Sequence, residues 1–160
     1  LGDVYKRQDS DQAWERLSKR IVTVSKGWSE AYGLFLKGEA DMVLSYTTSP
    51  AYHIIAEQDS RYAAAAFTEG HYQQIEVAGL VRGSQQKQLA REFLEFMISA
   101  EFQQIIPTTN WMYPVVTGKS LLPAEFDQLI DPAPALLLDE RQVAAERKRW
   151  VDEWLEVMSR

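Results

Sequence analysis

The run TVSKGWSEAYGLFLKGEADMVLSYTTSPAYH, residues 23–53, carries the strongest fold signal in this sequence. It overlaps the β-branched run Ile21–Val24 and contains a second apolar run, Met42–Tyr46, and both are typical of buried strands. Between them, Ser29–Lys37 has the apolar spacing of a helix, with Ser29 as a possible cap. The pair Ser49–Pro50 predicts the start of another helix. Alternating strands and helices at this spacing indicate β-α-β units, and therefore an α/β fold with a parallel sheet.

Further elements are expected on both sides of this run. Periodicity and capping residues predict two more strands and four more helices. The strands are expected at Tyr62–Ala66 and Gln73–Val81. One helix is expected at Asp11–Arg20, and three others are expected to be capped by Ser84, Ser99 and Asp139. Pro107 is expected to end the helix capped by Ser99. The inward face of the helix capped by Ser84 is expected to comprise Leu89, Phe93, Phe96 and Met97. That of the helix capped by Asp139 is expected to comprise Val143, Trp150, Trp154 and Met158. Loops are expected at Thr108–Thr117 and, mostly irregular, at Leu121–Leu138.

Composition excludes several classes of function. The chain has 160 residues and a formal net charge of -6, which argues against a nucleic-acid partner because phosphate-binding surfaces are basic. No apolar run is long enough to span a membrane, so direct membrane insertion is not expected. Cysteine is absent, which excludes disulfides, thiolate metal sites and cysteine nucleophiles.

Polar side chains follow the second predicted strand, where a loop leads into a helix. Ligands of open parallel sheets bind beyond the carboxyl ends of the strands, at such junctions. Thr47, Thr48 and Ser49 place hydroxyl groups beside the unpaired N–H groups of the helix that starts at Pro50. This arrangement suits an anion such as a phosphate. The alternative is that Ser49 only caps its helix and the threonines only form the turn.

Aromatic residues gather around the same predicted loops. Trp28 and Tyr46 lie at strand-end junctions, Tyr52 in the following helix, and Trp111 and Tyr113 in the loop NWMYP. Aromatic side chains at such a position can sandwich a flat heterocycle and attract a cationic one. The alternative is ordinary packing in the core, which applies most directly to Tyr52 and Tyr113.

Motifs for catalysis or metal binding are absent from the sequence. His53 and His71 are the only imidazoles, and they lack the spacing of a zinc site. The sequence has no nucleophile elbow, no P-loop and no dinucleotide-binding glycine motif. We therefore expect no catalytic residue, no metal ligand and no cofactor.

The opening run resembles a segment of the periplasmic thiamine-binding proteins of bacterial ABC importers. The resemblance continues in the same order through FTEGHYQQIEVA, FLEFMISAEFQQIIPTTNWMYPV and RQVAAERKRWVDEW. The resemblance implies the type II periplasmic binding protein fold, in which two α/β lobes close on a ligand. It covers only the C-terminal half of such a protein. Residues 9–70 would belong to the second lobe, 71–120 would supply a crossover strand and helices of the first, and 121–160 would pack across the lobes. We expect this half not to fold well alone.

The resemblance also implies a ligand and a set of contacts. In this family the tryptophan that matches Trp28 stacks on thiamine, and the matching Tyr46, Thr47, Thr48 and Ser49 add further contacts. Tyr52 and Trp111 match aromatic positions that line the cleft. The implied ligands are thiamine and its phosphates, the implied partner is the membrane permease of the importer, and the implied compartment is the periplasm.

Two other functions remain open from the sequence. An iron(III) or other small-anion carrier of the same fold would use neighbouring tyrosines as iron ligands, and no Tyr-Tyr pair occurs here. A catalytic α/β domain could keep its acid–base residues outside this chain. Release of phosphate from a thiamine phosphate would distinguish an enzyme from a pure binding protein.

The first eight residues, LGDVYKRQ, fit the family poorly. DVYKRQ is what GAT-GTG-TAT-AAG-AGA-CAG encodes, a string that looks like the transposon end used to tag DNA for sequencing. We expect residues 1–8 to be non-native sequence derived from such an adapter, with Leu1-Gly2 at the junction. A divergent but genuine helix end is the alternative.

Overall fold

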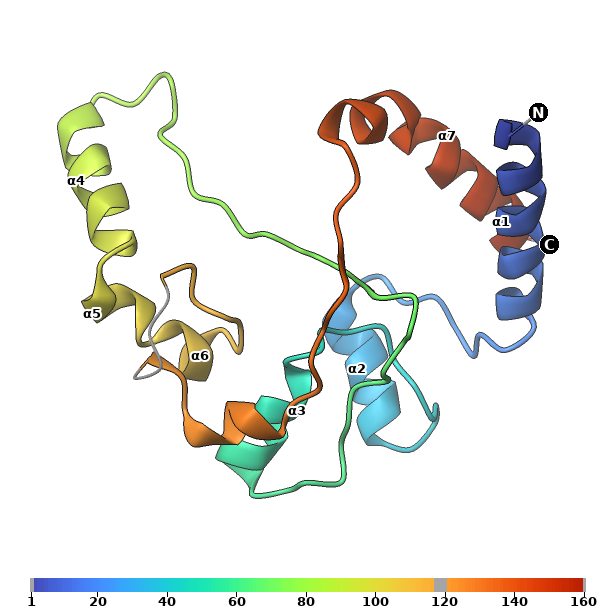
Figure 1. The fold of residues 1–160 in the computed structure, drawn as a ribbon, viewed down its shortest axis with the longest axis horizontal. Coiled ribbons are helices and arrows are strands. Elements are labelled where there is room, and N and C mark those ends of the chain that lie inside the picture. The colour runs from blue at the N-terminus through green and yellow to red at the C-terminus, as the bar shows by residue number, and fades with distance from the viewer. Residues whose placement is uncertain (1, 117–120, 160) are drawn as a thin grey trace. The chain divides into compact units, whose positions relative to one another are not determined.

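A computed structural model describes residues 2–116 and 121–159 of the chain. It divides into two compact units, the first formed by Leu1–Ser45 with Leu137–Arg160 and the second by Tyr46–Leu136. Figure 1 shows the order of the elements along the chain. The end of the predicted loop Thr108–Thr117 and of the predicted segment 71–120 lies outside the described residues. The assignment of residues to the lobes of a larger protein stays a prediction.

Three helices form the first unit: α1 at Gly2–Ser18, α2 at Trp28–Leu36 and α7 at Glu140–Met158. α1 and α7 pack side by side (Figure 1). The predicted start of the first helix at Asp11 is wrong, because the helix already begins at Gly2. Residues 3–10 contain neither proline nor glycine, so nothing in the backbone interrupts the helix before Asp11.

The helix α2 begins one residue before Ser29, which corrects the predicted cap. Gly27 is the N-cap in an extended conformation, and the Glu30 carboxylate accepts a hydrogen bond from the Lys26 N–H at 3.2 Å. At the other end, Gly38 has a φ of 75° and donates its N–H to the Phe35 carbonyl at 2.9 Å. This left-handed residue closes the helix at low steric cost because it is glycine.

The second unit is built from short elements. α3 at Ser49–Tyr52 runs directly into η1, a π-helical turn at His53–Glu57, and the longest helix is α4 at Lys87–Met97. The remaining elements are β1 at His71–Tyr72, α5 at Ala100–Gln103, α6 at Ile106–Thr109, the 3-10 helix η3 at Ala124–Gln128 and β2 at Ala135–Leu136. β1 and β2 pair in parallel, with His71 opposite Ala135 and Tyr72 opposite Leu136.

The β1–β2 pair depends on the absence of a side chain at residue 70. Gly70 has a φ of 106°, and a Cβ atom built there would lie 2.4 Å from the Pro134 carbonyl oxygen. The same oxygen accepts a hydrogen bond from the His71 N–H at 3.1 Å. Only glycine allows this backbone conformation together with this close approach.

The predicted helix caps are partly confirmed. The Ser99 side chain accepts from the Phe102 N–H at 3.3 Å, and Asp139 accepts from the Gln142 N–H at 3.0 Å, so both are N-caps. The predicted cap at Ser84 is wrong, because α4 starts after Gln86. The Ser84 hydroxyl instead accepts from the Gln86 N–H at 3.1 Å, in the turn that precedes the helix.

Two other predicted helix boundaries are also corrected. Thr48, not Ser49, is the N-cap of α3, so Ser49 is the first helical residue and Pro50 the second. Pro107 lies in the first turn of α6 and does not end the preceding helix, α5, which already ends at Gln103. Proline fits a first helical turn because its missing N–H would have no helical partner there.

None of the four predicted strands is a strand in the described chain. Ladder pairing is absent from Ile21–Val24, Met42–Tyr46 and Tyr62–Ala66, and Gln73–Val81 contributes only the Gln73 N–H, which donates to the Leu136 carbonyl at 2.8 Å beside β1 and β2. Their apolar side chains are largely exposed, Leu44 to 91% and Val77 to 89%. A parallel strand needs a neighbour in register, and β-branched residues favour but do not form a ladder by themselves. No other described segment supplies that neighbour.

Burial differs between the two amphipathic helices. The predicted inward face of α4 is wrong in the described chain, because Leu89, Phe93 and Phe96 are exposed. The predicted stripe of α7 is half-buried, and Val157 beside it is buried in the unit that contains α1. Among the described residues, no helix is both long enough and apolar enough to cross a membrane.

Candidate ligand-binding site

Trp28 presents an aromatic face at the start of α2. Its indole N–H donates a hydrogen bond to the Ser45 hydroxyl at 3.1 Å, and its ring lies 4.7 Å from that of Tyr32 at an interplanar angle of 32°. Tyr32 is buried, but Trp28 remains 52% exposed. Trp28 is therefore held by two contacts while about half of its surface stays available to a ligand.

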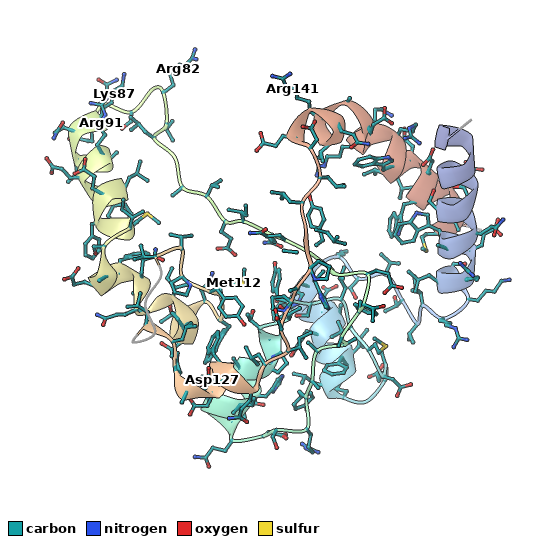
Figure 2. The ribbon with its side chains drawn as sticks, viewed as in Figure 1. Arg82, Lys87, Arg91, Met112, Asp127 and Arg141 are labelled. Atoms are coloured by element: carbon teal, nitrogen blue, oxygen red, sulfur yellow. The ribbon has the colours of Figure 1, made fainter. Side chains whose placement is uncertain are left out.

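The predicted hydroxyl cluster forms the turn before α3. The Ser49 hydroxyl accepts from the Tyr46 N–H at 3.2 Å, while the Ser49 N–H donates to the Tyr46 carbonyl at 3.0 Å. Thr48 is buried, and its hydroxyl donates to the sulfur of Met112 at 3.9 Å. Met112 is labelled in Figure 2. The Ser49 contacts lie within the turn itself, whereas the Thr48 hydroxyl ties the turn to Met112. The anion site at Thr47, Thr48 and Ser49 stays a prediction.

Tyr52 and Trp111, 59 positions apart in the sequence, are brought together in the second unit. Their ring centroids are 5.3 Å apart at an interplanar angle of 79°, an edge-to-face pair. Trp111 has a φ of 56°, which is unusual for a bulky residue and typical of functional sites. The neighbouring Asn110 amide donates to the Glu76 carboxylate at 3.1 Å and ties this loop down.

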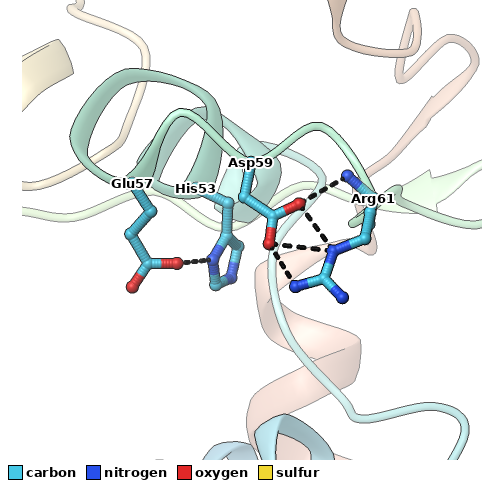
Figure 3. A network of polar contacts seen from close by, with 4 residues as sticks. All are labelled: His53, Glu57, Asp59 and Arg61. Atoms are coloured by element: carbon cyan, nitrogen blue, oxygen red, sulfur yellow. Dashed lines mark hydrogen bonds and ion pairs between the residues drawn. The ribbon is translucent and has the colours of Figure 1, made fainter.

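Two residues beside Tyr52, His53 and Glu57, were not predicted to belong to the site. The imidazole of His53 is completely buried, and its Nδ1 lies 2.6 Å from the Glu57 carboxylate (Figure 3). Its ring stacks on Tyr62 with centroids 3.8 Å apart and planes at 24°. A hydrogen bond to Glu57, and the negative charge of that carboxylate, raise the pKa of Tyr52. The i, i+4 spacing of His53 and Glu57 was the available sequence signal.

An ion pair completes the network on the far side of η1 (Figure 3). The Arg61 guanidinium donates to both oxygens of Asp59, with the shortest contact 2.6 Å, and the Arg61 backbone N–H adds a bond of 3.0 Å. Hydrogen bonds from the Arg61 side chain and backbone lower the pKa of Asp59 to about 2. Gln58, with a φ of 55°, ends the helical turn just before this pair.

Tyr113 has a packing role. Its ring lies 5.6 Å from that of the buried Phe126 at 72°, and burial, followed by the charge of Asp131, raises its pKa. Within the described ranges, no group of three His, Cys, Asp or Glu side chains is placed to hold a metal ion.

A family model described as bacterial extracellular solute-binding protein matches residues 3–104. The chain belongs to this family. Two relatives, both named thiamine-binding periplasmic protein, come from Escherichia coli K12 and Brucella melitensis. They are 57% and 51% identical over 95% of this chain and 46% of their own length. A solved structure, named periplasmic thiamin binding protein, matches with a TM-score of 0.90 and 57% identity, over 95% of this chain and 47% of that chain.

These similarities confirm two expectations from the sequence. The resemblance to periplasmic thiamine-binding proteins is confirmed, and so is the α/β fold of half a two-lobe solute-binding protein. The chain spans about half the length of the curated relatives it matches. Their names describe binding proteins, so the iron(III) carrier and the catalytic fragment are not favoured.

Proposed function

We propose that this chain is part of a periplasmic protein that binds thiamine and delivers it to an ABC importer. The observation that carries the proposal is the 57% identity to a relative named for thiamine binding. The protein would act as a carrier and not as an enzyme, so thiamine would leave it chemically unchanged.

The chemistry of thiamine suits the aromatic side chains described above. Thiamine has a flat pyrimidine ring and a cationic thiazolium ring, and aromatic faces attract cations. The half-exposed face of Trp28 and the Tyr52–Trp111 pair offer such surfaces. We propose Trp28, Tyr52 and Trp111 as contacts for thiamine.

The residues of the turn before α3 extend the proposal to the phosphate esters of thiamine. Tyr46, Thr47, Thr48 and Ser49 would contact the end of the ligand that carries the phosphate. Backbone N–H groups at a helix start favour a negative charge. The Ser49 and Ala51 N–H groups already donate to the Tyr46 and Thr48 carbonyls, so the side chains of the turn and the helix dipole would attract the phosphate.

Delivery follows from differential binding. A ligand that binds the closed protein better than the open one shifts the population toward the closed state. The closed state would then be recognised by the permease, and import would be driven elsewhere in the transporter. No covalent step is required of any residue in this chain.

Calorimetric titration with thiamine tests the proposal. Because the chain matches 46% of the Escherichia coli relative, the protein to use is a hybrid in which residues 9–160 replace the matching half of that relative. We expect one thiamine per molecule to bind and to be recovered unchanged. Absence of binding in a folded hybrid, or release of phosphate from thiamine monophosphate, would refute the proposal.

A further inference from the structure

We infer that Gln103 is a positioning residue of the ligand site, because its buried amide fastens the loop that carries Trp111. The inference rests on the proposed function, since it takes Trp111 as a contact for thiamine. The loop comprises Asn110–Val115 and is called the Trp111 loop below. Gln103 acts through the backbone of this loop and not by contact with the ligand. Nothing in the sequence distinguishes it from the neighbouring Gln104.

Gln103 is the last residue of α5, which lies between α4 and α6 (Figure 1). The residue is buried, with 5% of its surface exposed. Its Nε2 donates to the carbonyl of Met97, the last residue of α4, at 2.7 Å, and its Oε1 accepts from the Val115 N–H at 2.8 Å. The reverse orientation of the amide would set donor against donor and acceptor against acceptor. Both ends of the Gln103 amide are therefore fixed.

Two backbone hydrogen bonds fix the ends of the Trp111 loop. At its start the Asn110 N–H donates to the Ile106 carbonyl at 2.9 Å, where α6 ends. At its other end the Val115 N–H donates to Gln103. Only residues 111–114 lie between the two bonds, and residue 114 is a proline whose ring fixes its φ. Ties at both ends of so short a segment leave its backbone few alternative paths.

Trp111 needs such ties because its backbone conformation is costly. Its φ of 56° lies in the left-handed region, which disfavours a bulky residue by a factor of about 5 to 30 in an equilibrium constant. A conformation of this kind persists only where the surrounding contacts impose it. In this conformation the Trp111 ring meets the Tyr52 ring edge to face, with centroids 5.3 Å apart. Release of Val115 would let Trp111 return to an ordinary φ and move its ring away from Tyr52.

Burial makes the Gln103 contact stronger than two other side-chain contacts of the loop. The hydrogen bond from Asn110 to Glu76 is exposed, so water can replace either partner. The sulfur of Met112 is only a weak acceptor for the Thr48 hydroxyl. Loss of the Gln103 amide would instead leave two backbone groups without their partner at a partly buried place.

The first test replaces Gln103 by methionine, which has a similar length but no amide, in the hybrid protein. We expect Gln103→Met to weaken thiamine binding by about 5- to 30-fold in calorimetric titration, because the loop can then relax at Trp111. Gln104→Met is the matched control, one residue away, where the side chain is exposed and its Nε2 donates to the Glu101 carbonyl at 3.2 Å. This control should stay within about 2-fold of the unmodified protein. Circular dichroism shows whether each variant is folded.

A pH-dependent rescue separates the two hydrogen bonds from the mere filling of space. In Gln103→Glu an ionised carboxylate can only accept, whereas the protonated carboxyl offers a donor to the Met97 carbonyl and an acceptor to the Val115 N–H. Burial raises the pKa of a carboxyl, so the introduced group gains its proton in mild acid. Relative to the unmodified protein, we expect Gln103→Glu to bind thiamine poorly at about pH 8 and within about 3-fold at about pH 5. Gln104→Glu, with an exposed carboxyl, should show no such change.

A third readout needs no ligand. The indole N–H resonance of Trp111 is identified in a proton–nitrogen correlation spectrum as the one that is missing from Trp111→Phe. We expect this resonance to move in Gln103→Met, because the indole leaves its place beside Tyr52. It should not move in Gln104→Met.

The outcomes distinguish this inference from the proposed function. A folded Gln103→Met that binds thiamine within about 2-fold of the unmodified protein would overturn the positioning role, and so would an unmoved Trp111 resonance. An equal loss at both pH values in Gln103→Glu would overturn the role of the two hydrogen bonds. Failure of the unmodified hybrid to bind thiamine would refute only the proposed function, since the Trp111 resonance would still report on Gln103. If Gln103→Met does not fold, Gln103→Glu at the two pH values decides.

Discussion

Replacement of Trp28 by alanine should weaken thiamine binding by about 5- to 30-fold. Trp28 is 52% exposed, so a stacked ligand would cover its free face and displace the water there. An aromatic–cation contact contributes about 1 kcal/mol at an exposed site and about 2 kcal/mol when it is desolvated. Those energies correspond to the stated range, because each 1.4 kcal/mol changes a dissociation constant about tenfold.

Two further substitutions separate stacking from positioning. Trp28→Phe keeps a flat ring of smaller area and should lose less than Trp28→Ala. Ser45→Ala removes the hydroxyl that accepts the indole hydrogen bond at 3.1 Å. Water can replace this acceptor at an exposed site, so we expect a loss of less than about 1 kcal/mol in binding, under about 5-fold.

The assay is calorimetric titration of the hybrid protein with thiamine, with circular dichroism to show that each variant is folded. Lys148→Ala is the control, since a surface ion pair contributes little. The stacking argument would be refuted if folded Trp28→Ala bound thiamine within about 2-fold of the unmodified protein. It would also be refuted if Ser45→Ala cost as much as Trp28→Ala.

Three further predictions concern stability. Gly70→Ala should lower the unfolding free energy by more than about 1 kcal/mol because of the φ of 106° and the blocked Cβ position. Gly79→Ala, where nothing lies within 4 Å and φ is not positive, should be neutral or mildly stabilising in the same thermal melts. The pKa of Asp59 is lowered from 3.8 to about 2, so its stabilising effect should be present above pH 4 and lost as the pH falls toward 2. The melting difference between unmodified protein and Asp59→Asn should therefore shrink over that range, and an undiminished difference would contradict the ion-pair assignment. Residues 9–160 alone should unfold without a sharp thermal transition, because long apolar runs are exposed; a cooperative transition with dispersed amide resonances would contradict this.

Local signals in the sequence predicted part of the local structure. Ser99 and Asp139 are N-caps as expected, and Gly38 closes its helix in the left-handed region. Each of these features depends on a few residues that are close along the chain, because a capping side chain meets N–H groups within three residues. The predicted cap at Ser49 is wrong by one residue because Thr48 is the N-cap by its backbone position, without a side-chain capping bond.

Strand pairing was predicted poorly because it depends on distant partners. The runs at Ile21–Val24 and Met42–Tyr46 have strand composition, yet the described chain holds no neighbour in register for them. The pair that does form joins His71–Tyr72 to Ala135–Leu136, and neither segment stands out in composition. A ladder forms where two backbones meet, and the order of residues in one segment does not specify its partner.

The candidate site also has features that the sequence predicted and features that only the folded chain shows. The sequence singled out Trp28 because an aromatic side chain in a loop has no regular core face to join, and the resemblance to the family added Tyr52 and Trp111. The pairing of Tyr52 with Trp111, and the contacts of His53 with Tyr52 and Glu57, came from the folded chain. Ring-to-ring contacts and buried hydrogen bonds need exact distances between segments, and those distances exist only once the chain has packed.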